Sequence, residues 1–208
     1  MKYLRSKYFY GWIAATTLSL FLVNFLLQPD TYAVSPSSIA FVLVYLLTGL
    51  IVGVCQWFIL RLYFERAYWW IVLTAVGEIP FYLFRQGYFL FLFYTVGESD
   101  SLMRFYVGLL AFVGALFPGI FQWLFFRRRV RRAWMWIVAS AIAELWIPRL
   151  IGMYLIQGTS ILLLEMSHAR FLLAITVTGI ILGVITGIPV ADFINQVRQP
   201  GVNNEVDR

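Results

Sequence analysis

Apolar residues occur in six long runs along the chain, and short polar or basic segments separate them. Each run has about 20 residues, the length that a helix needs to cross the hydrocarbon core of a bilayer. Segment 85–104 is aromatic up to Tyr94 and then polar, which predicts an interfacial or re-entrant piece followed by a loop. The pattern predicts helices at about 9–27, 39–60, 67–84, 105–126, 133–156 and 170–194.

The runs form a repeat, seen most clearly in residues 53–78 and 119–144. The first copy reads GVCQWFILRLYFERAYWWIVLTAVGE and the second GIFQWLFFRRRVRRAWMWIVASAIAE, 66 residues later and without a gap. The regions around Trp12 and Gly183 fit the same pattern. The sequence therefore predicts an all-α integral membrane fold, a single domain of residues 1–195. Its six transmembrane helices form three parallel-repeat α-hairpins, at 8–62, 66–128 and 132–194.

Composition supports a membrane protein. The chain of 208 residues is 62% hydrophobic and 12% charged, whereas soluble domains carry about 25% charge. The net charge of +6 is concentrated beside helix ends, which indicates topology and lipid headgroups rather than nucleic acid. Lys and Arg gather in both tails and in the turns after helices 2 and 4. The positive-inside rule then predicts cytoplasmic termini in a bacterial inner or thylakoid-type membrane, with 196–208 as a polar, disordered tail.

Small residues recur four positions apart on helices 2, 4 and 6. This spacing places them on one helix face and lets backbones approach closely. We therefore predict that helices 2, 4 and 6 are central, with the odd-numbered helices flanking them; the alternative is a gap for a lipid or pigment. The residues are Gly49, Gly53, Ala115, Gly119, Gly179, Gly183 and Gly187.

Two buried amides lie near the basic turns. Gln56 and Gln122 each precede the first turn arginine by five residues. Amides inside a membrane usually bond to a neighbouring helix, so structural cross-linking is one interpretation and a polar site near the cytoplasmic mouth is the other. The third hairpin carries Thr186-Gly187 in this place, so such a site is not threefold.

Two glutamates are the main candidates for an intramembrane site. Glu78 and Glu144 each lie eight residues past a tryptophan that we take to mark the interface, which places them about 12 Å inside it. Ionisable groups at such depth usually face the protein interior and a partner, here Arg85 and Arg149. A proline follows each glutamate and can break or kink the helix. Either both glutamates share one polar pocket for a ligand or ion, or they form a structural network with the arginines.

The turn between helices 4 and 5 is a candidate site for lipid headgroups or an acidic partner, or it is only a topology signal. The sequence has no Gly-x-Ser-x-Gly motif, one histidine (His168) and one cysteine (Cys55), so it predicts no metal site and no familiar catalytic group. Whether the protein binds a cofactor stays open from the sequence. The arginines of the turn are Arg127, Arg128, Arg129, Arg131 and Arg132.

The pattern Gly-x-x-Gln-Trp-x-x-x-Arg, followed by a basic turn and Ala-x-x-Trp, resembles repeats in a group of uncharacterised bacterial multi-pass membrane proteins, common in cyanobacteria. Residues 53–77 and 119–143 carry the resemblance. It implies a helical-hairpin fold in the inner membrane and no particular activity.

These observations favour a non-enzymatic partner or assembly subunit of a larger membrane complex. Its expected partners are membrane lipids and either another membrane protein or further copies of itself. The alternatives are a small transporter or ligand-binding subunit that uses Glu78 and Glu144, and an intramembrane enzyme with a catalytic glutamate.

Overall fold

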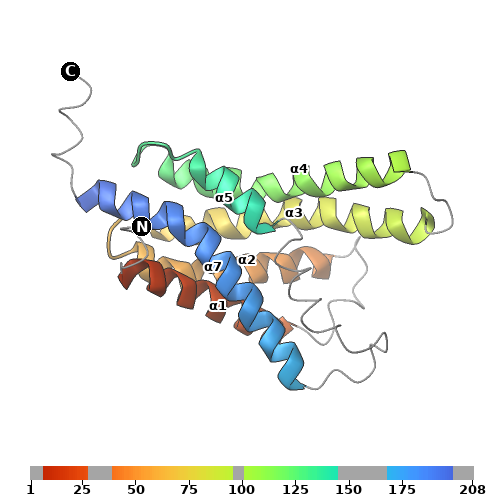
Figure 1. The fold of residues 1–208 in the computed structure, drawn as a ribbon, viewed down its shortest axis with the longest axis horizontal. Helices are drawn as coiled ribbons and strands as arrows, with labels where there is room; N and C mark the ends of the chain where they lie inside the picture. Colours follow the sequence, from red (N-terminus) through yellow and green to blue (C-terminus); the bar gives the residue numbers. More distant parts are fainter. Residues whose placement is uncertain (1–6, 28–38, 96–100, 145–167, 199–208) are drawn as a thin grey trace.

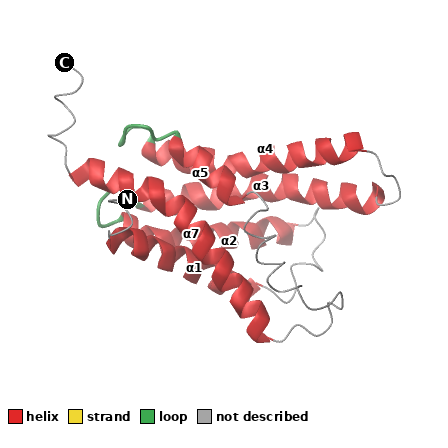
Figure 2. Cartoon of the chain, viewed as in Figure 1, coloured by secondary structure: helices red, strands yellow, loops and turns green. Residues whose placement is uncertain are grey.

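The computed structural model describes residues 7–27, 39–95, 101–144 and 168–198, and within these ranges the chain is helical apart from two turns. The turns comprise residues 61–67 and 127–134 (Figure 2). The predicted all-α fold is confirmed for this part of the chain. The helices are α1 (Lys7–Leu27), α2 (Ile39–Leu60), α3 (Tyr68–Thr95), α4 (Ser101–Phe126), α5 (Met135–Glu144) and α7 (His168–Arg198).

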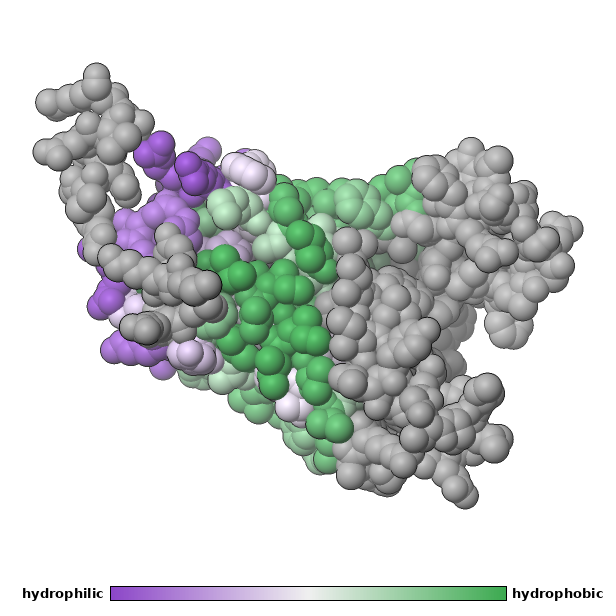
Figure 3. All heavy atoms as spheres, viewed as in Figure 1, coloured by the Kyte–Doolittle hydropathy of each residue, from purple (hydrophilic) through white to green (hydrophobic). Residues whose placement is uncertain are grey.

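Among the described residues, three helical segments are long and apolar enough to cross a membrane: Lys7–Leu27, Val42–Leu60 and Leu172–Arg198. Phe112–Phe126 is a shorter apolar helical segment. The helices run mainly along the long axis of the molecule (Figure 1). Apolar residues cover its middle, and hydrophilic residues gather at one end (Figure 3).

Two predicted boundaries are wrong. Helix α3 continues through Pro80 to Thr95, so residues 85–95 are helical rather than re-entrant. Proline removes only one backbone donor, and α3 packs against α4 beyond Pro80, where the ring centroids of Phe84 and Phe117 lie 5.3 Å apart. Helix α7 continues to Arg198, so the predicted tail does not start at Gln196. Residues 145–156 of the predicted fifth helix lie outside the described part of the chain.

The six described helices form a closed ring. Each of them contacts the next described helix along the chain, and α7 contacts α1. In the described ranges, the backbones of α2, α4 and α7 are not neighbours, although α4 and α7 meet through side chains such as Phe126 and Phe193, whose ring centroids lie 4.8 Å apart. Each of these helices packs its backbone against odd-numbered helices, so the prediction that helices 2, 4 and 6 are central, with the odd-numbered helices flanking them, is wrong.

The glycines explain this arrangement, because they face odd-numbered helices. A methyl group built on Gly53 would lie 2.9 Å from the Cα of Ile71 in α3, and one built on Gly119 would lie 3.1 Å from the Cα of Ile137 in α5. On Gly183 it would lie 2.7 Å from the Cα of Ile13 in α1. Close backbone approach thus joins each even-numbered helix to an odd-numbered neighbour.

Gly183→Ala is expected to destabilise the protein by about 1–3 kcal/mol, because the added methyl group meets the backbone of α1 and must push the helices apart. This cost exceeds the gain of about 1 kcal/mol that alanine brings to a helix. The matched control is Gly11→Ala, whose methyl group would meet only the end of the Ile59 side chain, at 3.2 Å. Thermal unfolding in detergent measures both variants. Equal unfolding midpoints for the two would contradict the backbone contact.

Candidate functional site

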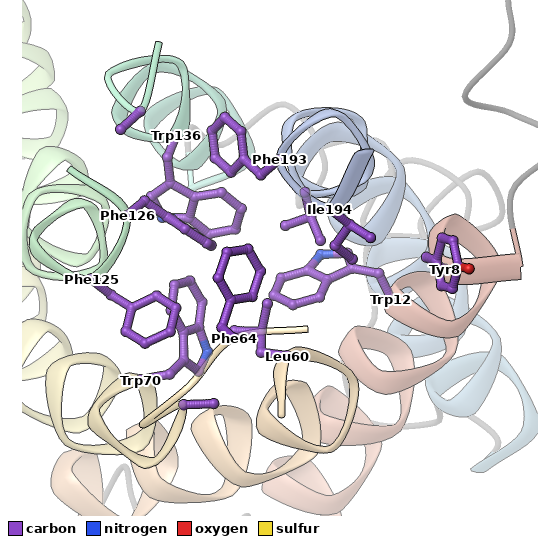
Figure 4. Close-up of a cluster of buried hydrophobic side chains, with 13 residues drawn as sticks. Tyr8, Trp12, Leu60, Phe64, Trp70, Phe125, Phe126, Trp136, Phe193 and Ile194 are labelled. Atoms are coloured by element: carbon purple, nitrogen blue, oxygen red, sulfur yellow. The ribbon is translucent and has the colours of Figure 1, made fainter. Parts of the chain in front are cut away.

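Three tryptophans from the odd-numbered helices meet inside the ring near its basic end. Trp12, Trp70 and Trp136 are at most 1% exposed. Their ring centroids lie 6.0 Å (12–70), 5.8 Å (12–136) and 5.2 Å (70–136) apart, in edge-to-face orientations. All three point into the cluster of buried side chains that the helices surround (Figure 4). We call these residues the tryptophan triad.

The triad adds a role for two tryptophans that the sequence analysis uses only as markers of depth in the membrane. Trp70 and Trp136 lie in the protein core rather than on its outer surface. Edge-to-face ring pairs of this kind contribute about 0.5–1.5 kcal/mol each beyond the area that they bury. The residues packed around the triad come from the helix ends and turns: Leu60, Phe64, Phe125, Phe126, Val190, Phe193 and Ile194.

Each indole N–H of the triad donates to a side chain on an even-numbered helix. Trp70 Nε1 donates to Gln56 Oε1 at 3.1 Å, and Trp136 Nε1 donates to Gln122 Oε1 at 3.0 Å. Trp12 Nε1 donates to Thr186 Oγ1 at 2.9 Å. A buried indole N–H needs such an acceptor, because the interior offers no water in exchange.

The two glutamines also use their amide donors. Gln56 Nε2 donates to Thr16 Oγ1 at 3.4 Å, and Gln122 Nε2 donates to Thr74 Oγ1 at 3.0 Å. Each carboxamide therefore links three helices: α1, α2 and α3 for Gln56, and α3, α4 and α5 for Gln122. Both side chains are buried, at 6% exposed. The interpretation of these amides as bonds to neighbouring helices agrees with the structure.

The end of the ring next to the triad is strongly basic. The start of α1, the end of α7 and both turns meet there (Figure 1). In the part of the chain that the structure covers, this end carries nine Lys or Arg side chains against Glu65 and Asp192. The basic side chains are Lys7, Arg61, Arg66, Arg127, Arg128, Arg129, Arg131, Arg132 and Arg198.

Aromatic rings hold several of these guanidinium groups. Arg61 lies 4.9 Å from the ring centroid of Trp57, and Arg127 lies 5.7 Å from that of Trp123, the equivalent residue of the second copy. Arg129 lies 4.1 Å from the Phe125 ring centroid. Partial burial lowers the pKa of Arg129, and the charge of Arg66 lowers it further. The structure thus brings arginines of the two turns together.

The two turns share an unusual backbone conformation. Arg66 has φ 54° and Arg132 has φ 58°, both in the left-handed region, which side chains other than glycine rarely adopt. These residues lie 66 positions apart, as the repeat requires. Arg131 is tied to the end of α7, because its backbone N–H donates to Gln196 Oε1 at 2.8 Å.

Glu78 is buried between α2 and α3, at 7% exposed. Its Cγ would lie 3.0 Å from a methyl group built on Gly49, so the missing side chain of that glycine makes room for the glutamate. Thr74 and Trp70 precede Glu78 by four and eight residues, on the same face of α3. The side chains of Glu144 and of the predicted partner Arg85, together with Arg149, lie outside the described part of the chain.

Two further residues that the sequence analysis names lie in the helices of the ring. Ala115 in α4 is buried, and Cys55 in α2 is half-buried. Among the described residues, no cluster of His, Cys, Asp and Glu has the geometry of a metal site. A shallow, mostly apolar groove of about 470 Å³ follows the outside of α1 and α7; its lining includes Tyr10, Thr17, Phe21, Thr176 and Ile180.

The fold and the triad define an all-helical protein with helices suited to a membrane and a core cross-linked by polar side chains. No protein-family model, curated protein or solved structure matches the chain. Sequence reasoning missed the triad as a unit. The signal was present, because Trp70 and Trp136 each follow a glutamine by 14 residues, and this is the spacing of the two hydrogen-bonded pairs.

Gln122→Leu is expected to lower the free energy of unfolding by about 1–3 kcal/mol, because it removes the acceptor of Trp136 and the amide donor to Thr74. Chemical or thermal unfolding in detergent measures the change. The control is Thr176→Val: its hydroxyl is exposed and donates only to the carbonyl of Leu172 in its own helix. This control is expected to change stability by less than about 0.5 kcal/mol. Equal stability of the two variants would rule out a cross-linking role for Gln122.

Proposed function

We propose that the chain is a multi-pass membrane protein of three helical hairpins about a pseudo-threefold axis. Two observations support this. Helices α3 and α4, with 28 and 26 residues, are long enough to span a bilayer. Residues that the repeat makes equivalent also form equivalent bonds, as in the Gln56–Trp70 and Gln122–Trp136 pairs. The resemblance to bacterial hairpin-repeat proteins agrees with this proposal.

The basic end is proposed to face the cytoplasm, in a bacterial inner or thylakoid-type membrane. Its excess of Lys and Arg over acidic residues follows the positive-inside rule. Arginines held against Trp57 and Trp123 would then lie at the height of the lipid headgroups, where each basic side chain contributes about 1 kcal/mol of attraction to anionic lipids.

Labelling with a membrane-impermeant maleimide tests the orientation. In a Cys55→Ala background, Arg128→Cys is expected to react with the maleimide only after the cell membrane has been permeabilised. Ser99→Cys, between α3 and α4, is expected to react in intact cells. The opposite pattern would reverse the proposed topology, and reaction at both positions in intact cells would contradict a membrane-crossing hairpin.

For function we propose a non-enzymatic partner or assembly subunit of a larger membrane complex. The observation that supports it best is the tryptophan triad, because it fills the axis along which a substrate would have to pass through the ring. Large apolar side chains face outward instead. At equivalent positions of the three hairpins, Phe58 is 49% exposed, Leu124 37% and Ile188 47%. Such surfaces suit contacts with lipid or with another membrane protein.

Photo-crosslinking distinguishes these contacts. A benzophenone amino acid replaces Phe58, Leu124 or Ile188, one position at a time, and mass spectrometry of the gently extracted protein identifies the products. A partner subunit is expected to crosslink from one or two of the positions to one and the same protein, while the others give lipid adducts and so serve as controls. Lipid adducts at all three, together with a lone protein that retains one small molecule, would overturn the proposal.

Glu78 supports a second candidate, a small transporter or ligand-binding subunit. A carboxyl group buried between α2 and α3 is costly inside a membrane and often marks an ion or substrate site. Glu78→Gln keeps the shape and removes the charge. If the protein is a binding subunit, the Glu78→Gln variant is expected to retain at least tenfold less ligand than the unchanged protein, while its unfolding midpoint stays the same. Loss of stability without loss of a ligand would identify Glu78 as structural.

A further inference from the structure

Gln56, Gln122 and Thr186 each lie on an even-numbered helix between two odd-numbered helices, and we call these three places the junctions of the ring. The third junction, at Thr186, differs from the other two. The junctions at Gln56 and Gln122 each join an indole N–H to a threonine hydroxyl through one carboxamide. In the third junction Thr186 accepts from Trp12, but the equivalent of Thr74 is Ser140, 66 residues later. Ser140 is 4% exposed, and its Oγ is buried without a hydrogen-bond partner.

The backbone places Ser140 where Thr74 lies in the preceding hairpin. The Cβ of Thr74 is 3.3 Å from a methyl group built on Gly53, and the Cβ of Ser140 is 3.0 Å from one built on Gly119. Thr74 bonds to α4, the next even-numbered helix. Ser140 therefore belongs at the junction of α5 with α7, which are in contact.

Thr186 cannot complete this junction. Its single hydroxyl proton is donated to the carbonyl of Leu182, at 2.7 Å. One acceptor site of its oxygen takes the Trp12 N–H, and one acceptor site is left. Threonine also has two side-chain heavy atoms fewer than glutamine, and serine has one fewer than threonine, so the third junction contains less protein than the other two.

We propose that a water molecule binds between Ser140 and Thr186 and takes the place of the glutamine amide. It donates one proton to the remaining acceptor site of Thr186 Oγ1 and accepts the proton of Ser140 Oγ. Buried waters typically need two to four polar partners, and these two hydroxyls supply the minimum. The site suits a ligand with about one heavy atom that can both donate and accept a hydrogen bond. The junction between α5 and α7 is then the hydrated one of the three junctions.

Nuclear Overhauser spectroscopy of protein with ¹⁵N-labelled tryptophan tests the site directly. The indole proton of Trp12 is expected to show a cross peak with long-lived water, whereas Trp70 and Trp136, which bond to glutamines, serve as internal controls and show none. Replacement of each tryptophan by phenylalanine assigns the three signals. A Trp12 signal that is no stronger than those of the two controls would overturn the proposal.

Two variants separate bound water from magnetisation relayed through the Thr186 hydroxyl. Ser140→Ala removes one partner of the water but leaves Thr186 intact, so it is expected to weaken the Trp12–water cross peak at least twofold. Thr186→Gln is expected to abolish the cross peak and to raise the unfolding midpoint by about 2–4 °C, because its amide can reach both Trp12 and Ser140. A cross peak that persists unchanged in Ser140→Ala would refute the water site, even if both variants fold normally.

Discussion

Three buried indole N–H groups impose the constraint on which the rest of this fold depends. An apolar interior provides no water to accept these protons, so a helix neighbour has to supply an acceptor at each one. Gln56, Gln122 and Thr186 do so. Each bond fixes both the height and the rotation of one helix against another. In the membrane that we propose for this protein, lipid is as apolar as a leucine side chain, so burial of apolar area would not hold the helices together, and these polar bonds and close packing would do so.

The glycines allow the polar junctions to form. Gly53 and Gly119 bring α2 onto α3 and α4 onto α5, and Gly183 brings α7 onto α1. On this side of each even-numbered helix an indole N–H bond accompanies the glycine contact. The amide donors of Gln56 and Gln122 then reach the odd-numbered helix on the other side, so packing and hydrogen bonding both rely on the inner faces of the odd-numbered helices. This closed, well-packed axis is the feature that favours a structural role in a larger assembly over passage of a substrate.

Much of this arrangement could be predicted from the sequence. The run lengths gave the helix positions, the repeat gave the equivalence of Gln56 with Gln122, and Lys and Arg indicated the basic end. The inward faces could not be predicted, because the exposed residues of these helices, such as Phe58, are as apolar as those in the core and leave no amphipathic pattern. For the same reason the sequence does not reveal that Trp70 points into the core, since tryptophans are also common on the outer surface at a membrane interface. The continuation of α3 past Pro80 depends on packing against α4, which no local pattern reveals. Of the predicted glutamate site, the structure describes Glu78 and its contact with Gly49, while the side chains of Glu144 and Arg85 lie outside the described part of the chain.

Hydrogen–deuterium exchange of the tryptophan indole protons, followed by NMR in detergent micelles, tests the central claim most directly. The chain has eight tryptophans, which provide comparisons within one molecule. If the triad forms the hydrogen-bonded core, the indole protons of Trp12, Trp70 and Trp136 should exchange at least a hundredfold more slowly than those of Trp69 and Trp134, which are exposed beside the turns. Similar exchange rates for all five would contradict the account.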